Sequence, residues 1–180
     1  MINTILSNQY YLLILLMIVT AFPVGFFAGY FGIGGGLISV PVLFFIFETA
    51  DVDKSYLMHL SVGTAFSITI FTAFVSVMTH RKHKAVDTNI LKTYGLFVIF
   101  GVLLGTYMAA LLNTKSLVLF FAVVVYFFGG YLLLVKQELK KNKKFKFLPR
   151  ATFGFISGFI SAPMGITGAM MNVPILRYFG

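Results

Sequence analysis

Two glycine-rich segments without charged residues carry the pattern in this chain that could bind an anion. The first runs from Gly25 to Pro41 as GFFAGYFGIGGGLISVP, and the second from Gly154 to Pro174 as GFISGFISAPMGITGAMMNVP. Glycine lets a ligand approach the backbone closely, and the unpaired N–H groups at a helix start attract negative charge. Two such turns around one cavity would coordinate a small anion. A nucleotide phosphate loop is disfavoured, because no Lys-Ser/Thr pair follows the glycines.

The candidate binding residues come from both glycine-rich segments and from the apolar stretch 55–79. His59 and nearby hydroxyl groups could bind the anion, although hydroxyls in helices also bond back to the preceding turn. Ser76 and His80 lie one turn apart on one helix face and could gate the passage of the anion. Either histidine could instead be solvated at a helix end. The candidate binding residues are Gly32, Gly34, Gly35, Gly36, Pro41, His59, Gly63, Thr64, Ser67, Gly165, Thr167, Gly168 and Pro174.

The glycines could instead serve only helix packing. Small residues spaced four positions apart let helix backbones approach closely in a membrane. Three glycine pairs have this spacing, and packing alone is the expected role of the middle pair. The first and last pairs could equally frame the two broken segments. The pairs are Gly25/Gly29, Gly101/Gly105 and Gly154/Gly158.

Metal, cofactor and enzymatic chemistry are not expected. The chain has no cysteine, which excludes disulfides, thiolate metal sites and cysteine nucleophiles. Met164, Met170 and Met171 flank the second glycine segment, where packing is favoured over copper binding. An intramembrane enzyme that uses His59 or His80 is a minor alternative, because no nucleophile–base set accompanies them. We therefore expect no cofactor and no metal.

The composition is that of an integral membrane protein. Of 180 residues, 59% are hydrophobic and 11% charged, with a mean hydropathy of +0.95, whereas soluble domains have about 45–50% apolar and about 25% charged residues. Residues 1–47, 93–114 and 116–135 contain no ionisable Asp, Glu, Lys, Arg or His, and 55–79 contains only His59. Each run reaches the ~20 residues that cross ~30 Å of hydrocarbon as a helix. We expect an all-α, polytopic membrane protein.

The elements form two repeats in this interpretation. Tract 10–47 would extend ~55 Å as one helix, so we predict two helical pieces joined by a turn near Gly32–Gly36. A re-entrant hairpin is favoured over a first piece that crosses fully. Helices at about 55–79, 92–112 and 116–135 complete a first repeat over 1–135, a basic linker covers 136–150, and an incomplete, truncated second repeat begins over 151–180.

The basic residues predict the orientation in the membrane. Loops 80–84 and 136–150 hold most of the positive charge, and such loops face the cytoplasm by the positive-inside rule. The loop Glu48–Lys54 is then outside. If the first tract is a hairpin, the repeats are inverted, and if it crosses once, they are parallel. We favour the inverted arrangement in a plasma membrane, with a bacterial inner membrane as the expected setting.

Three motifs in order give the chain a family resemblance. GYFGIGGGLISVPVL at 29–43, HLSVGTAFSI at 59–68, and Ser76 with His80 ahead of residues 81–87 resemble the TauE/SafE sulfite-exporter family of membrane permeases. The resemblance implies a two-repeat transporter that moves sulfite or organosulfonates by alternating access. Ala65-Phe66 departs from the serine and leucine that the family prefers, and the second copy lacks a His-x-x-x-Gly-Thr element.

The expected partners are a small anionic substrate and the lipid bilayer, with no nucleic acid. The alternative function is a non-transporting membrane scaffold or assembly protein. The second repeat extends only six residues beyond Pro174. We therefore expect either a piece of a longer chain or a protein that completes its cavity as a homodimer.

Overall fold

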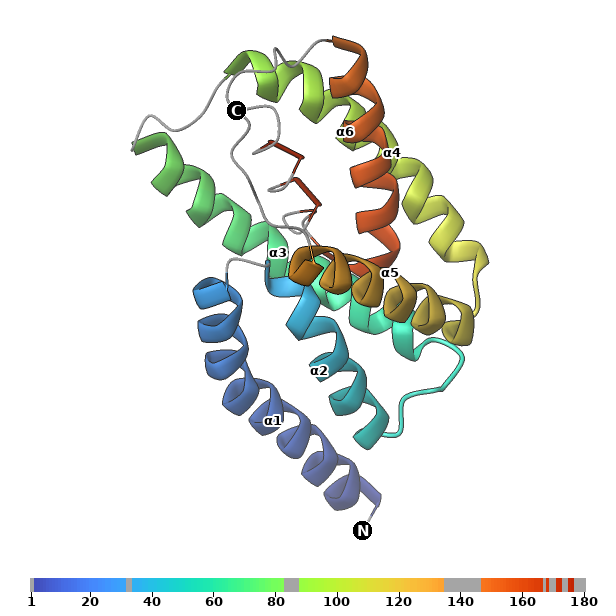
Figure 1. The fold of residues 1–180 in the computed structure, drawn as a ribbon. Helices are drawn as coiled ribbons and strands as arrows, with labels where there is room; N and C mark the ends of the chain where they lie inside the picture. Colours follow the sequence, from blue (N-terminus) through green and yellow to red (C-terminus); the bar gives the residue numbers. More distant parts are fainter. Residues whose placement is uncertain are drawn as a thin grey trace.

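The computed structural model describes residues 2–31, 34–82, 88–134, 147–166, 168, 171–172 and 175–176. Every regular element in this part of the chain is an α-helix, which confirms the predicted fold class (Figure 1). Four of the helices contain apolar spans long enough to cross a membrane. The helices are α1 (Ile2–Phe31), α2 (Gly35–Thr49), α3 (Leu57–Lys82), α4 (Thr88–Leu111), α5 (Thr114–Leu134) and α6 (Phe147–Met164).

Glycine, and not proline, breaks the long first tract. α1 continues through Pro23, and α2 continues through Pro41. The break lies between them, where Gly34 has φ 85° and ψ 141°, a conformation that side chains with a Cβ rarely adopt. Figure 1 shows that the chain reverses direction at this break, so α1 and α2 form a hairpin. The depth of this hairpin in the membrane stays a prediction.

Helix α6 begins within the segment predicted to be the basic linker. Residues 147–150, assigned above to the basic linker, already form the first turn of α6. Pro149 is compatible with this position, because the first turn of a helix does not need the proline N–H. The helical segment therefore extends four residues into the predicted linker.

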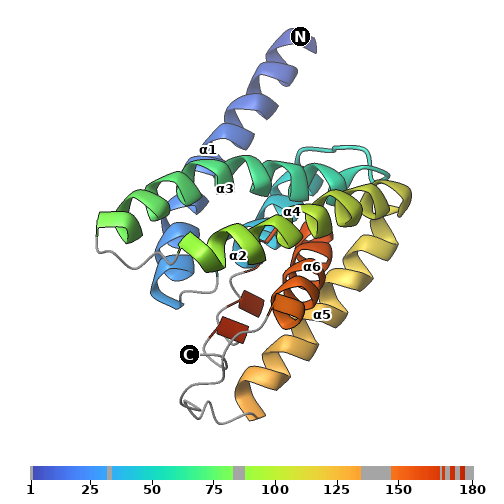
Figure 2. The ribbon, with the colours of Figure 1, turned by 90° about the horizontal axis from the view of Figure 1, so that it is seen from above.

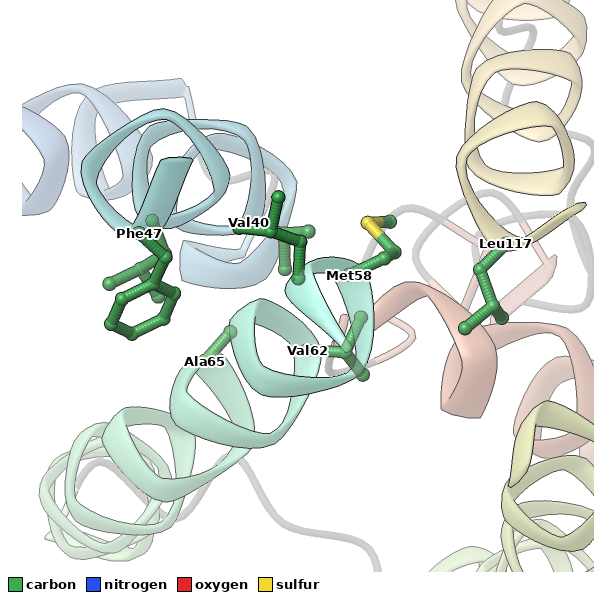
Figure 3. Packing of buried hydrophobic residues seen from close by; sticks show 8 residues of the cluster. Val40, Phe47, Met58, Val62, Ala65 and Leu117 are labelled. Atoms are coloured by element: carbon green, nitrogen blue, oxygen red, sulfur yellow. The ribbon is translucent and has the colours of Figure 1, made fainter. Parts of the chain in front are cut away.

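The helices pack in two groups. In the first, α1 lies against α2 and α2 against α3; in the second, α6 lies against α4 and α5. Side chains from α2 and α3 form an apolar cluster that Leu117 of α5 joins (Figure 3). The labelled members of this cluster are Val40, Phe47, Met58, Val62, Ala65 and Leu117.

α4 and α6 pack at backbone distance through four glycines. A Cβ added at Gly101 would overlap the Phe155 carbonyl oxygen, and one added at Gly158 would overlap the Val98 carbonyl oxygen. Gly105 and Gly154 are covered in the same way. Packing is therefore the role of two of the three predicted glycine pairs. At the remaining pair, Gly25/Gly29, no atom of the described residues lies within 4 Å of either added Cβ.

Two turns that the charge pattern predicts to be extracellular lie at the same end of the molecule. The hydroxyl of Thr114, at the start of α5, donates a hydrogen bond to the carbonyl oxygen of Ser55 at 2.7 Å. Nearby, Asp53 accepts a hydrogen bond from the Ser55 N–H, which lowers the pKa of the Asp53 carboxyl. These contacts tie the α2–α3 loop to the α4–α5 turn.

Candidate functional site

The two glycine-rich segments meet backbone to backbone at the centre of the molecule. A Cβ added at Gly36, in the first turn of α2, would overlap the carbonyl oxygen of Gly165 and lie 2.8 Å from the Cα of Ile166. A Cβ added at Gly165 would lie 2.9 Å from Val40 Cγ2 and 3.3 Å from the Cα of Val62. We call the contact of Gly36 with Gly165 the glycine junction. It joins α2, α3 and the end of α6.

α1 and α6 run toward the glycine junction from opposite ends of the molecule (Figure 1). Each is followed by a turn that contains glycine with positive φ: Gly34 at 85°, Gly165 at 66° and Gly168 at 70°. Glycine adopts these angles at little cost, whereas other residues would be strained. The sequence therefore predicts both breaks correctly.

The start of α2 offers backbone donors to the junction. Gly34 caps α2 without a side-chain hydrogen bond. The first N–H groups of a helix have no partner within the helix, and the helix dipole adds a fractional positive charge there. α2 has 15 residues, which is long enough for this effect. This end of the site fits a small anion.

The second segment uses its backbone amides differently from the prediction. The Gly165 N–H donates to the Ala162 carbonyl and the Ile166 N–H to the Ser161 carbonyl, both at 3.2 Å. With Gly165 at positive φ, these two bonds are the Schellman motif that ends α6. The amides of Met171 and Asn172 likewise donate to the Gly168 carbonyl. Of the predicted second set of free donors, Gly165 to Gly168, the amides of Gly165 and Ile166 are therefore committed to the fold.

A polar cluster that the sequence analysis missed lies beside this second turn. The Tyr94 hydroxyl donates to Asn172 Oδ1 at 2.6 Å, and the Ser157 hydroxyl donates to the same oxygen. The Ser161 hydroxyl bonds to the carbonyl of Ser157, and both serines are buried. Because Oδ1 accepts two bonds, the side-chain amide is held in one orientation, with Nδ2 3.0 Å from where a Gly168 Cβ would lie. Asn172 thus holds its N–H donors beside Gly168, which is also closely approached by the hydroxyls of Ser157 and Ser161.

One sequence signal could have identified Asn172. It lies two residues before Pro174, as Ser39 lies two residues before Pro41. Both copies therefore place a polar side chain at the same position after the glycine break. Ser39 is also buried, with 7% of its surface exposed. Polar groups at matched positions in two apolar repeats are a pointer to a shared site.

A small, mainly apolar pocket opens beside the Asn172 cluster. It lies between the turn that follows α6 and one side of α5. Gly168 and Ser161 belong both to this pocket and to the surroundings of the Asn172 side chain. The lining residues are Val124, Phe128, Ser161, Met164, Ile166, Gly168 and Met171.

The predicted residues on α3 are not gathered at the junction. His59 Nε2 lies 3.3 Å from the carbonyl oxygen of Ala109, which links α3 to α4. Thr64 is half-buried, whereas Gly63 and Ser67 are exposed. The Ser67 hydroxyl bonds back to the Gly63 carbonyl at 3.1 Å, which is the structural alternative stated for it. Val62, and not Gly63, is the α3 residue that meets Gly165.

The remaining predicted residues divide between a distant helix end and the undescribed positions. Ser76 and His80 are exposed in the last turns of α3, so their gating role stays a prediction. Pro41 is half-buried within α2. Gly32, Thr167 and Pro174 lie outside the described residues, as do most of the basic linker and part of the loop 80–84.

Known proteins resemble this chain over most of its length. A probable membrane transporter protein of Haemophilus influenzae is 30% identical over 93% of this chain and 64% of its own length. A probable membrane transporter protein of Methanocaldococcus jannaschii is 27% identical over 95% of this chain and 64% of its own length. One of Bacillus subtilis is 24% identical over 89% of this chain and 66% of its own length.

This chain therefore covers about two thirds of the length of its curated relatives. No solved structure matches it. The family described as "Sulfite exporter TauE/SafE" matches residues 17–180. The residues quoted in the sequence analysis and the helical, glycine-broken architecture agree with this match. The chain belongs to the TauE/SafE sulfite exporter family of membrane transporters.

Proposed function

We propose that this protein carries small anions, with sulfite or an organosulfonate as the substrate class, and binds them at the glycine junction. The observation that carries the proposal is the backbone contact of Gly36 with Gly165. It brings together, from two ends of the molecule, the segments whose glycines favour close approach of a ligand. The family description supplies the substrate class.

The site recognises the anion with neutral donors in this proposal. The first amides of α2 supply one side, and Nδ2 of Asn172 supplies the other. None of the long apolar runs contains Asp or Glu, so the substrate meets no carboxylate on these helices. A full positive charge inside the membrane would be costly and would hold an anion tightly. Dipolar donors let a carrier bind the anion and then release it.

The packing of the helices in two groups supports the alternating access that we propose. α2 moves with α3, and the end of α6 moves with α4, because each broken segment packs on its own long helix. The groups meet at the glycine junction, at Leu117 of α5, which packs on the α2–α3 cluster, and at His59, which contacts the Ala109 carbonyl oxygen. A rocking motion of one group against the other would expose the α2 amides first to one side of the membrane and then to the other.

The protein is a multi-pass membrane protein, and we propose a cell-membrane location with the basic loops in the cytoplasm. Arg81 and Lys82 at the end of α3 are exposed, and the clustered charge there matches the positive-inside rule. The α2–α3 loop and the α4–α5 turn are then both outside. Their hydrogen bond between Thr114 and Ser55 supports this common side.

Flux in proteoliposomes tests the proposal. Sulfite, thiosulfate and an organosulfonate are each offered to wild-type protein, to Gly36→Ala and to the control Gly129→Ala. An added Cβ crowds the junction at Gly36 but meets nothing within 4 Å at Gly129. We expect flux of at least one anion with wild-type and Gly129→Ala protein and its loss with Gly36→Ala. Flux that survives Gly36→Ala would remove the binding site from the junction, and no flux of any anion with inserted protein would remove the substrate class.

A further inference from the structure

α1 has a glycine face that the described part of the chain leaves uncovered. A Cβ added at Gly25 or Gly29 would meet nothing within 4 Å. Only 6% of the apolar span Tyr11–Tyr30 is buried. α1 contacts α2 through another side, where Ala28 is buried. Figure 2 shows the N-terminal part of α1 projecting away from the other helices.

The equivalent face of α6 is fully occupied. Residues 25–29 read GFFAG and residues 154–158 read GFISG, so the glycines of α1 and α6 correspond. A Cβ added at Gly154 would lie 2.8 Å from the carbonyl oxygen of Tyr94 and 3.3 Å from Cβ of Phe97. Gly158 is covered by the carbonyl of Val98. The same surface that is empty in the first repeat therefore holds a helix in the second.

The helix that packs on α6 brings glycines to the contact and runs in the same direction as α6. It is α4, which brings its own glycines, Gly101 and Gly105, to the contact. Tyr94 of α4 contacts Gly154 of α6, and further along, Gly105 of α4 contacts Phe159 of α6. Residue numbers therefore rise in the same direction along both helices, which run parallel. α4 comes from the first repeat and α6 from the second. The two repeats are thus joined by an exchange of helices.

We propose that the Gly25–Gly29 face of α1 binds a second transmembrane helix of the α4 type, parallel to α1 and with small residues four apart at the contact. In a two-repeat protein this helix is the second repeat's own counterpart of α4. The curated relatives are longer than the stretch that they share with this chain, which spans 64% of the H. influenzae protein. They therefore have the length for such a helix.

A polypeptide helix fits this face better than lipid or an identical α1. Lipid chains adapt to any apolar surface and gain nothing from two glycines, each of which costs a helix ~1 kcal/mol relative to alanine. An α1–α1 pair would set glycine against glycine around a two-fold axis, whereas the occupied copy of this face takes a different, parallel helix. The bulky exposed Phe22 and Phe26 lie four residues apart along one edge of the glycine face and would pack against one side of the incoming helix.

Cysteine cross-linking tests this proposal, because the natural chain has no cysteine. The probe is a peptide of Thr88–Leu111 with lysine flanks and Phe97→Cys, inserted into vesicles that hold the full chain. The chain carries Gly25→Cys, because Gly25 corresponds to Gly154 of α6. A Cβ added at Gly154 lies 3.3 Å from Cβ of Phe97, which is close to the Cβ–Cβ distance of ~3.5–4.5 Å in disulfides. The control chain carries Phe27→Cys, which lies on the opposite side of α1.

We expect the Gly25→Cys chain to cross-link the peptide about tenfold faster than the Phe27→Cys chain, a difference of about 1.4 kcal/mol. Adding Gly29→Leu to the Gly25→Cys chain should abolish this advantage while the unfolding temperature stays unchanged, because Gly29 has open space around it. Equal rates for the two cysteines would overturn the proposal. Disulfides that form between two Gly25→Cys chains in preference to the peptide adduct would also overturn it, because a second copy of the chain would then occupy the Gly25–Gly29 face. Anion flux is not a readout here, so the outcome is independent of the proposed function.

Discussion

At the residue scale, Gly36 and Gly165 approach each other more closely than any other glycine contact in the described part of the chain. Alanine at position 36 would place a Cβ against the Gly165 carbonyl, whereas alanine at position 35 has nothing within 4 Å of its Cβ. Forcing an extra carbon into a packed site costs about 1–3 kcal/mol. We therefore expect Gly36→Ala, but not Gly35→Ala, to lower the unfolding temperature in detergent. A similar unfolding temperature for both variants would show that the junction can separate without cost.

Tyr94 positions the Asn172 side chain, which we proposed above as a donor to the anion. Tyr94→Phe removes the hydroxyl that donates to Asn172 Oδ1 at 2.6 Å, and a side-chain hydrogen bond between membrane helices contributes about 0.6 kcal/mol. We expect little loss of stability but a higher half-saturation concentration for the transported anion, with a smaller change in maximal rate. Tyr107→Phe, on the same helix at a 65% exposed position, is the matched control. A fall in maximal rate alone would contradict a positioning role.

At the element scale, the α4–α6 contact is the most demanding packing in the described structure. The helices approach so closely that the carbonyl of Val98 lies where a Cβ of residue 158 would be. In a bilayer, helix association depends on close van der Waals packing, because lipid chains are as apolar as the side chains. Gly158 therefore determines how near α4 and α6 can come.

Gly158→Ala should push α6 away from α4 and destabilise the protein by about 1–3 kcal/mol. Gly130→Ala on α5, where an added Cβ meets nothing within 4 Å, should have little effect. The measurement is urea or thermal unfolding of both variants in the same detergent. An unfolding temperature of Gly158→Ala equal to that of the wild type would mean that the helices can shift along each other to accommodate the methyl group.

At the scale of the whole molecule, the orientation in the membrane can be mapped because the chain lacks cysteine. A cysteine at Asp53 or Asn113 lies at the end where Thr114 bonds to Ser55. A cysteine at Lys82 lies at the other end of α3. We expect a membrane-impermeant maleimide to label the first two positions from outside intact cells and position 82 only after permeabilisation. Labelling of positions 53 and 82 from the same side would contradict a full crossing by α3.

Local features of the sequence determined the helices and their breaks. Long charge-free runs must be helical in lipid, because only a helix or a closed barrel satisfies its own backbone. Gly34, Gly165 and Gly168 mark the breaks because they occupy positive φ. The recurrence of the motif also predicted that the two breaks surround one cavity, whereas in the structure they lie in direct backbone contact at Gly36 and Gly165.

The tertiary structure alone decided which faces meet. Tyr94 and Asn172 lie 78 residues apart, and the surrounding residues do not mark either as a partner of the other. The amides of Gly165 and Ile166 were predicted to be free, but the end of α6 uses them. In water, a contrast between polar and apolar faces shows which side of a helix is buried, whereas lipid and protein interior are equally apolar and remove that contrast. The sequence by itself therefore determined the helices and where they break, and only packing decided that α4 covers the glycines of α6 while those of α1 stay open.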